Sequence, residues 1–376
     1  MELVDVLREG MNRGASDFHL KPRQHPVFRV QGRLTTVDAL PIVEPEDLDK
    51  MAHGMMTPAQ RERFEREGGT DVQYSVDGLG RFRASICRAR GRTSLALRVV
   101  PYDLPGIEDL NLPPVVAKLA MEPRGLTLVT GPAGSGKTTT LAAMIRYMND
   151  QRNDHIVTIE DPIEYLHRDN GCIITQREVG TDTRSFADAL RICLRQDPDV
   201  IMVGEMRDLE TIRTVLTLAE TGHLVLSTLH TITATETVNR IIAEFPGHQE
   251  RQIRAQLAQV LRGIVSQRLI ERSDGSGLLP AVEVLVNTVT IQRCIEDPAR
   301  TAQIPQALAE GRDTYGMQTF DQCLLDYYRR GLISYEEALR AASSPVDFEV
   351  EVQRLSMLGG MPAQPAAGVP PRPPGR

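Results

Sequence analysis

The chain has 376 residues, of which 41% are hydrophobic and 25% are charged. This length suits two or three domains, and the composition is that of an ordinary globular protein rather than a disordered or fibrous one. Lysine and arginine number 43 against 50 aspartates and glutamates, and the resulting net charge of −7 argues against a broad nucleic-acid-binding surface.

Cysteine use favours a reducing compartment. No two of the five cysteines form a CxxC pair, which argues against a disulfide framework or a structural zinc site: Cys87, Cys172, Cys193, Cys294 and Cys323. Residues 1–10, MELVDVLREG, lack the basic and apolar segments of a signal peptide, and no run of about 18 apolar residues occurs. We therefore expect a cytoplasmic protein that associates peripherally with a membrane only through a partner.

The first 100 residues predict a small α+β domain. Apolar residues at helical spacing predict a short helix over 3–11. The stretch 27–37 predicts two strands separated by a Gln-Gly turn, and 81–100 alternates and predicts a hairpin that turns at an Arg-Gly pair. Residues 101–120 begin with a proline-rich stretch and form the expected interdomain linker.

A second domain is expected at 121–285, where short apolar runs alternate with helical patterns. The runs are too continuous for half-exposed strands and too short for helices. They predict strands buried on both faces of a mostly parallel sheet, at 125–130, 155–160, 199–205 and 223–228. Helical patterns between them, such as 185–196 and 209–221, complete an α/β fold.

The C-terminal part reads as mainly helical. Residues 251–270, RQIRAQLAQVLRGIVSQRLI, predict one long amphipathic helix. A helical region is expected at 286–355. The tail at 356–376 is rich in proline and has no packing pattern, so we expect it to be disordered.

Residues 131–138, GPAGSGKT, match the phosphate-loop pattern G-x-x-x-x-G-K-[ST]. An apolar run precedes them and a helical pattern follows, which is the context that the motif requires. Lys137 would reach the β- and γ-phosphates, and the Thr138 hydroxyl would bind Mg²⁺. We therefore expect ATP and Mg²⁺, and the nucleotide-binding residues would be Gly131, Ala133, Gly134, Ser135, Gly136, Lys137, Thr138 and Thr139.

Acidic residues and a histidine follow the other predicted strands. In an open α/β sheet, ligands bind beyond the carboxyl ends of the strands. Glu205 would act as general base on the attacking water, and Glu164 is a second candidate for positioning water or Mg²⁺. Glu160 and Asp161 could also contact the metal through a bound water. His230 would read the γ-phosphate.

His223 and His230 flank one predicted strand, 223–228. Residues seven apart on a strand point to opposite faces, so the two histidines are not expected to share a metal or to form a catalytic pair. His230 would lie on the nucleotide side. His223 would lie at the other end, where it either joins a subunit or domain contact or serves as a buried structural residue.

Four stretches of the chain resemble motifs of the secretion ATPase superfamily, the motors of type II secretion, type IV secretion and type IV pili. The stretches similar to its Walker A, Asp box, Walker B and His box motifs are 131–142, 158–167, 195–208 and 221–231. ASDFHLKP at 15–22 is similar to a segment near the start of the family's N-terminal domain, and 315–339 is similar to its C-terminal helical region. The resemblance covers roughly 1–345 and is closest to the retraction ATPases of type IV pili.

The resemblance implies a PAS-like N-terminal domain, a RecA-like ATPase domain and a ring of six subunits. In the family, nucleotide lies between the two domains and arginines of the N-terminal domain reach the γ-phosphate; the matching positions are Arg83 and Arg98. Arg207 and His223 would transmit the motion. The implied partner is an inner-membrane pilus platform protein, with no nucleic acid, and the implied work is pilus disassembly and twitching motility.

Two departures from the family pattern bear on the direction of work. Assembly ATPases usually carry a four-cysteine zinc element after the His box, and 266–284 has none, which favours retraction. Retraction ATPases usually carry an AIRNLIRE-like stretch, and TIQRCIED at 290–297 keeps only part of it. Pilus or type II assembly and an accessory retraction role therefore stay open, and a nucleic-acid translocase or a non-motor nucleotide switch is a more distant alternative.

Overall fold

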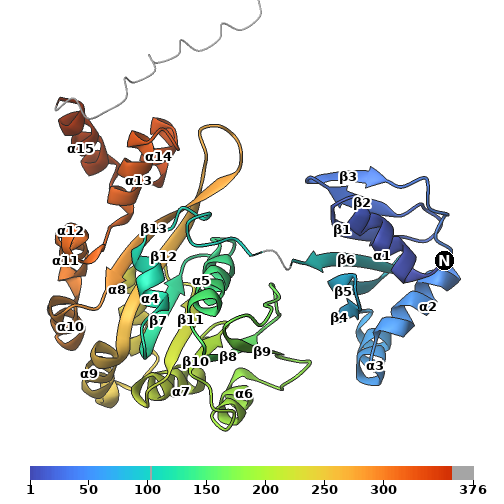
Figure 1. Cartoon of the computed structure of the whole chain (residues 1–376), viewed down its shortest axis with the longest axis horizontal. Helices are drawn as coiled ribbons and strands as arrows, with labels where there is room; N and C mark the ends of the chain where they lie inside the picture. The colour runs from blue at the N-terminus through green and yellow to red at the C-terminus, as the bar shows by residue number, and fades with distance from the viewer. Residues whose placement is uncertain (102–103, 358–376) are drawn as a thin grey trace, which may run out of the picture. The chain divides into compact units, whose positions relative to one another are not determined.

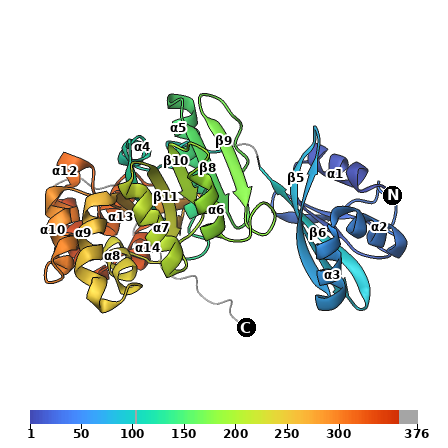
Figure 2. The same ribbon diagram turned by 90° about the horizontal axis from the view of Figure 1, so that it is seen from below.

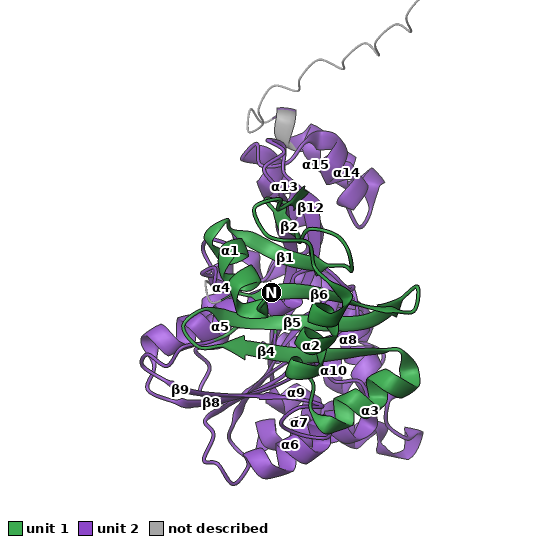
Figure 3. Cartoon of the chain, turned by 90° about the vertical axis from the view of Figure 1, so that its right-hand side faces the viewer, with its two compact units in different colours: residues 1–103, 164–166 green, residues 104–163, 167–376 purple. Residues whose placement is uncertain are grey.

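The computed structural model describes residues 1–101 and 104–357. It divides into two compact units, one of residues 1–103 with 164–166 and one of residues 104–163 with 167–376 (Figure 3). The proline-rich tail expected at 356–376 lies, from residue 358 onward, outside the described residues. The mixed α/β class expected from the sequence is confirmed, with a smaller unit before the larger one.

The first unit is a six-stranded antiparallel sheet with three helices on one face (Figure 2). The strands run in the order β3-β2-β1-β6-β5-β4. The elements are α1 (Leu3–Asn12), β1 (Ala15–Leu20), β2 (Val27–Val30), β3 (Arg33–Thr36), α2 (Pro45–Met55), α3 (Pro58–Glu67), β4 (Gly69–Val76), β5 (Gly80–Ala89) and β6 (Arg92–Val100). Three phenylalanines, Phe18, Phe28 and Phe82, pack edge to face in the core beneath the helices.

Both hairpins predicted in this unit are present. The β2–β3 turn at Gln31-Gly32 and the β5–β6 turn at Arg90-Gly91 have positive φ at both central residues. This two-residue geometry matches the right-handed twist of the flanking strands, and glycine adopts it without a steric penalty. Short X-Gly pairs between alternating stretches therefore located these turns from sequence.

The second unit is built on a seven-stranded sheet in the order β13-β12-β7-β11-β10-β8-β9 (Figure 1). All neighbours are parallel except β13, which is antiparallel to β12. The strands are β7 (Gly125–Thr130), β8 (His155–Glu160), β9 (Ile173–Glu178), β10 (Val200–Val203), β11 (Leu224–Leu229), β12 (Leu261–Glu271) and β13 (Leu278–Val286).

Helices cover both faces of this sheet. One apolar core gathers under α6 (Phe186–Cys193), α7 (Leu209–Glu220), α8 (Ala234–Ala243), α9 (Glu250–Val260), α10 (Val289–Glu296) and α11 (Ile304–Glu310). The core of the other face gathers under α4 (Val115–Ala120), α5 (Lys137–Gln151), α13 (Phe320–Arg329), α14 (Tyr335–Ala341) and α15 (Pro345–Met357). Every residue of β7 and β11 is buried, as the continuous apolar runs predicted. The short helix α12 (Arg312–Tyr315) links α11 to α13.

One predicted element is wrong. The long helix expected at 251–270 is instead α9, which ends at Val260, followed directly by β12. Residues after 260 pair with β7 on one side and with β13 on the other, and most of them are buried. Gly263 permits this pairing, because a Cβ there would lie 2.6 Å from both methyl carbons of Leu119. Tertiary pairing overrides the helical pattern, which periodicity cannot reveal.

The strand β9 was not expected. Its sequence, IITQRE, is largely polar because it forms the edge of the sheet and pairs only with β8. An edge strand is covered less than a central strand and needs fewer apolar residues. Its apolar pattern is therefore too weak to stand out.

Candidate nucleotide-binding site

The phosphate loop joins β7 to α5 at the carboxyl edge of the sheet. Gly131, Gly134 and Gly136 have φ of 147°, 76° and 87°, a range in which side chains with a Cβ are strained. A Cβ on Gly131 would also collide with the backbone oxygen of Gln267 on β12. The glycines therefore allow the backbone to turn sharply and to run close to the neighbouring strand.

The side chains of this loop suit a phosphate ligand. Lys137 Nζ donates to the carbonyl oxygens of Gly131 at 2.8 Å and Pro132 at 2.9 Å, which keeps the ammonium folded over the loop. Ser135 Oγ is buried and has no hydrogen-bond partner among the described residues. Thr138 and Thr139 are half-buried in the first turn of α5, where backbone N–H groups have no intrahelical acceptor. Ala133 is exposed at the tip of the loop.

Glu205 and His230 meet at the same edge. Glu205 follows β10 and His230 follows β11, which lies between β10 and β7. His230 Nε2 is 3.2 Å from Glu205 Oε2, and the Arg207 guanidinium pairs with Oε1 of the same carboxylate. The Glu205 side chain is only 13% exposed, whereas that of His230 is 61% exposed. The carboxylate is thus shielded and oriented by two cationic or polar neighbours.

Arg207 was expected to transmit motion, and its nearest partner is Glu205. Their hydrogen bond raises the pKa of Arg207, and the negative charge of Asp161 adds to the effect. Asp161 is exposed and follows β8. The carboxylates of Asp161 and Glu205 therefore both act on this guanidinium, which places them on one side of the sheet edge.

Glu160 and Glu164 have surroundings of a different kind. The Glu160 side chain is buried, and its Oε1 accepts from Thr158 Oγ1 at 2.7 Å and from Gln176 Nε2 at 3.0 Å. This carboxylate is engaged within the sheet between β8 and β9. Glu164 is exposed and belongs to the short stretch 164–166 that packs with the first unit. The second unit by itself therefore does not bring Glu164 to Glu205.

His223 has a local partner at the other end of β11. Its Nδ1 lies 3.1 Å from the carbonyl oxygen of Leu218 and 3.3 Å from Thr221 Oγ1, at the end of α7. The half-buried imidazole thus ties the end of that helix to the start of the strand. The six residues of β11 separate it from His230, and seven steps along a strand span roughly 23 Å. The two histidines lie at opposite ends of one strand, as the spacing indicated.

A hollow of about 340 Å³ opens beside His230. It is lined by side chains of the loop after β10, the loop after β11 and helix α8: Met206, Arg207, Leu229, His230, Thr231, Glu236 and Arg240. The sequence reading did not single out Arg240. Its only signal is its place on the polar face of an amphipathic helix, and there an arginine usually has no role beyond solvation.

The first unit carries a row of charged residues across its open face. Register places Arg29, Asp17, Arg98 and Arg83 side by side on β2, β1, β6 and β5. Arg98 Nε donates to Asp17 Oδ1 at 2.7 Å, and Arg29 Nε lies 3.7 Å from Oδ2. Burial raises the pKa of Asp17, but the hydrogen bonds from Arg98 and Ser16 and the positive charges of Arg98 and Arg29 together outweigh it and leave the pKa below its ordinary value.

Arg83 stands directly opposite Arg98. It is half-buried and has no hydrogen bond or ion pair to any described residue. Like charges directly opposite on a sheet repel, and one carboxylate does not balance three guanidinium groups. The row therefore favours an anion at Arg83 and Arg98.

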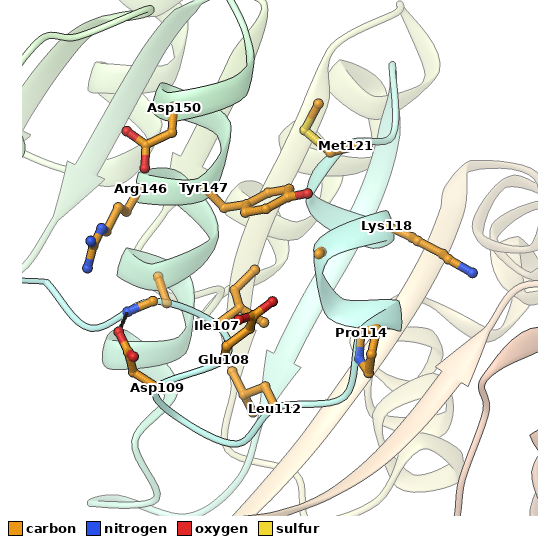
Figure 4. Close-up of a pocket in the computed structure, with 13 residues that line it drawn as sticks. Ile107, Glu108, Asp109, Leu112, Pro114, Lys118, Met121, Arg146, Tyr147 and Asp150 are labelled. Atoms are coloured by element: carbon orange, nitrogen blue, oxygen red, sulfur yellow. Dashed lines mark hydrogen bonds between the residues drawn. The ribbon is translucent and has the colours of Figure 1, made fainter.

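A larger cavity, about 570 Å³, lies away from the phosphate loop (Figure 4). It is bounded by 106–114, by α4 and by the C-terminal half of α5, from Ala143 to Asp150. Tyr147 lies across it and points toward α4, whereas Lys118 points away. No residue of the phosphate loop lines it, so we separate this cavity from the site at the sheet edge.

The described residues offer neither a ready metal cluster nor a membrane-spanning helix. Within 1–101 and 104–357, no group of three or more His, Cys, Asp or Glu side chains is arranged to hold a metal ion. In the same residues, no helix has the length and apolar character to cross a membrane. A metal at the sheet edge would therefore need ligands from a bound phosphate and from hydroxyl groups such as Thr138.

Comparison with known proteins gives the family. The model of the type II/IV secretion system protein family matches residues 2–314. The type IV pilus retraction ATPase PilT of Pseudomonas aeruginosa is 41% identical over 348 residues, 93% of this chain and 100% of that protein. The type IV pilus ATPase PilU of the same organism is 40% identical over 355 residues, 94% of this chain and 92% of that protein.

A solved structure agrees over nearly the whole chain. The crystal structure of the pilus retraction motor PilT with bound ADP superposes with a TM-score of 0.84 and 44% sequence identity, and it covers 93% of this chain and 99% of that one. The chain with this two-unit architecture and phosphate loop thus resembles PilT over 93% of its length. The chain belongs to the type II/IV secretion system protein family.

Proposed function

We propose that this chain is an ATP-hydrolysing motor that powers retraction of type IV pili. The observation that carries the proposal is the convergence of the phosphate loop, Glu205 and His230 on one edge of a parallel sheet. Hydrolysis needs a base beside the bound phosphates, and a shielded carboxylate at this edge can serve as one. A non-motor nucleotide switch would not need such a base. The likeness to retraction ATPases over almost the full chain supports the same reading.

The roles at the site follow from the chemistry of each side chain. ATP binds with its phosphates on the loop amides, and Lys137 leaves its two carbonyl acceptors to meet the β- and γ-phosphates. Glu205 accepts a proton from the attacking water while Arg207 and His230 orient its carboxylate. His230, which is exposed, is free to reach the γ-phosphate. Glu164 assists in positioning the water or Mg²⁺ when its side chain comes near the nucleotide.

Magnesium suits this site. Thr138 supplies a hydroxyl ligand, and Asp161 is better placed than Glu160 to hold a coordinated water, since Glu160 already accepts two hydrogen bonds. When bound, the ion neutralises charge on the β- and γ-phosphates during transfer. Ser135 Oγ supports binding of a phosphate with its metal ion, because this buried hydroxyl has no hydrogen-bond partner among the described residues.

The complete catalytic site requires the first unit. We propose that this unit is a PAS-like domain, that the second is a RecA-like ATPase domain, and that six subunits form a ring. Arg83 and Arg98 then meet the γ-phosphate, where a planar guanidinium stabilises the charge that develops on the transferred phosphoryl group. Their position in an uncompensated row of arginines supports this role. His223 links α7 to β11 and transmits the movement.

Retraction is preferred over assembly. The cysteines are scattered, and 266–284 forms the pair β12 and β13 without a four-cysteine element. An accessory retraction ATPase is the second candidate, because PilU is as similar to this chain as PilT. The motor would work in the cytoplasm against a platform protein of the inner membrane and would not bind nucleic acid.

A deletion strain tests the proposal. Loss of the chain should leave excess surface pili and abolish twitching, and the wild-type gene should restore both. A Lys137→Ala gene should not restore either, because the loop lysine is lost. Absence of surface pili in the deletion strain would mean that the chain serves assembly, and unchanged pili and twitching would refute a role in pili.

A further inference from the structure

One side chain outside the phosphate loop holds the loop in shape. Gln267 lies on β12 and is 3% exposed. Its Nε2 donates to the carbonyl oxygen of Ser135 at 2.7 Å, and its Oε1 accepts from Thr140 Oγ1 at 2.8 Å. The amide therefore bridges the middle of the loop to the first turn of α5.

The glycines of the loop are matched to this side chain. β12 runs parallel to β7, and Ser266 is paired with Thr130, so Gln267 lies level with the start of the loop. A Cβ on Gly136 would come within 2.7 Å of Gln267 Nε2, and a Cβ on Gly131 would collide with its backbone oxygen. Both glycines thus leave the space that Gln267 occupies.

Only an amide satisfies both partners. The Ser135 carbonyl needs a donor and the Thr140 hydroxyl, as arranged, needs an acceptor, and both atoms are out of contact with solvent. A glutamate would present an unprotonated oxygen to the Ser135 carbonyl, and a methionine would leave both groups without a partner. Buried polar groups left unsatisfied destabilise the conformation that buries them.

We propose that Gln267 is a positioning residue for the ATPase reaction. It touches the loop from behind and fixes the Ser135 peptide so that the following loop N–H groups face the phosphates. Without it the loop relaxes, and nucleotide must restore its shape at the expense of binding free energy. This inference rests on the proposed binding of ATP at the loop.

The charges near Gln267 are few. Lys137 on α5 is the ionisable group of the loop itself. Arg268 and Glu283 are the nearest ionisable residues of β12 and β13, and the alternation of side chains places Arg268 on the face opposite to Gln267. Glu283 is paired with Ser266 and faces the same way as Arg268. A carboxylate introduced at 267 would therefore meet the Ser135 carbonyl and the Thr140 hydroxyl.

The test uses Gln267→Met and Gln267→Glu in the full-length chain, with a fluorescent ATP analogue and with ATP turnover. Loss of two hydrogen bonds should weaken binding of the analogue by Gln267→Met about 30-fold. Gln267→Glu should be at least as weak at pH 8 and should recover relative to wild type by pH 5.5, since a protonated carboxyl donates to the Ser135 carbonyl. The exposed Gln259→Glu makes the same charge change and should leave binding unaltered at both pH values.

Thr140→Val provides a milder variant of the same contact. It removes one hydroxyl, and combined with Gln267→Met it should add little further loss, because both act on one bridge. Binding and turnover within twofold of wild type for all these variants, or a Gln267→Glu deficit that does not change with pH, would overturn the proposal. Wild-type protein that fails to bind the analogue would instead refute ATP binding at the loop.

Discussion

At the scale of single residues, the shielding of Glu205 is the feature on which its proposed catalytic role rests. Its carboxylate is nearly buried, while its partners Arg207 and His230 are mostly exposed. Exposed partners are free to exchange the carboxylate for phosphate oxygens when nucleotide arrives. The ion pairs at this edge orient the Glu205 carboxylate, as its proposed role requires, and they add little to stability because exposed pairs are screened.

The row of arginines in the first unit leads to a prediction about turnover. Arg98→Gln should lower kcat by roughly 100- to 1,000-fold, because one donor to the developing charge is lost. Binding of ADP should stay within a few-fold of wild type, since ADP lacks the γ-phosphate. Arg92→Gln, on the exposed hairpin turn, is the matched control and should be silent. Equal loss of kcat in both variants would remove the special role of Arg98.

Sequence reasoning reached part of the site and missed part. The phosphate loop could be predicted because its pattern of glycines is required by backbone geometry. Glu205 and His230 could be expected at one edge because each follows a buried strand, and their roles stay predictions. Gln267 was missed because it is remote in sequence from the loop that it contacts. Arg240 was missed because an arginine on the polar face of a helix is common. The one signal that could have pointed to Gln267 is a glutamine within an otherwise apolar stretch.

At the scale of elements, the strands β12 and β13 link the site to the C-terminal helices. Glu283 Oε1 on β13 accepts from the backbone nitrogen of Ala234 at 2.8 Å and so holds the start of α8, just after the loop of His230. On β12, the Arg268 guanidinium stacks on Phe320 of α13 at 3.7 Å from the ring centroid. These contacts connect the nucleotide edge with both helical layers.

Glu283 leads to a prediction about pH. Burial raises its pKa above the ordinary 4.5, so the folded chain binds more protons than the unfolded chain between the two values. Stability from this group is complete below the unfolded value and is lost as pH rises through the folded pKa. Glu283→Gln, which can still accept from Ala234, should melt above wild type at pH 7, and the difference should vanish at pH 4. A difference independent of pH would contradict this account.

The same strands mark the limit of prediction for the fold. Buried parallel strands and X-Gly hairpins were predictable, because their patterns are local and unmistakable. The stretch 251–270 was not, since its apolar spacing also suits a helix and only pairing with β7 and β13 decides the outcome. The edge strand β9 was missed for the opposite reason, because its exposure removes the apolar pattern.

At the scale of the whole molecule, the chain is similar to PilT over 100% of that protein's length. Each unit holds half of the proposed chemistry: the phosphate loop and base in one, the arginines in the other. Such a division makes hydrolysis depend on how units come together. Chemistry shared between units is a means of converting turnover into movement.

The proposed ring of six leads to a prediction about mixtures. Inactive Glu205→Gln subunits mixed with wild type should lower turnover more steeply than their fraction, because neighbouring subunits act together. Mixing should be done after dissociation and reassembly, with mass measured by light scattering. A strictly linear decrease, or a particle with the mass of a monomer at full activity, would contradict coupling within a ring.

The most direct test of the central claim is turnover by the purified Glu205→Gln protein. The change keeps shape and removes the base, so ATP hydrolysis should fall by roughly 100- to 10,000-fold while ATP binding stays at the wild-type level. Binding and turnover should be measured on the same preparation, with wild type alongside. Hydrolysis at the wild-type rate with binding intact would show that Glu205 is not the base and that the catalytic site has been assigned wrongly.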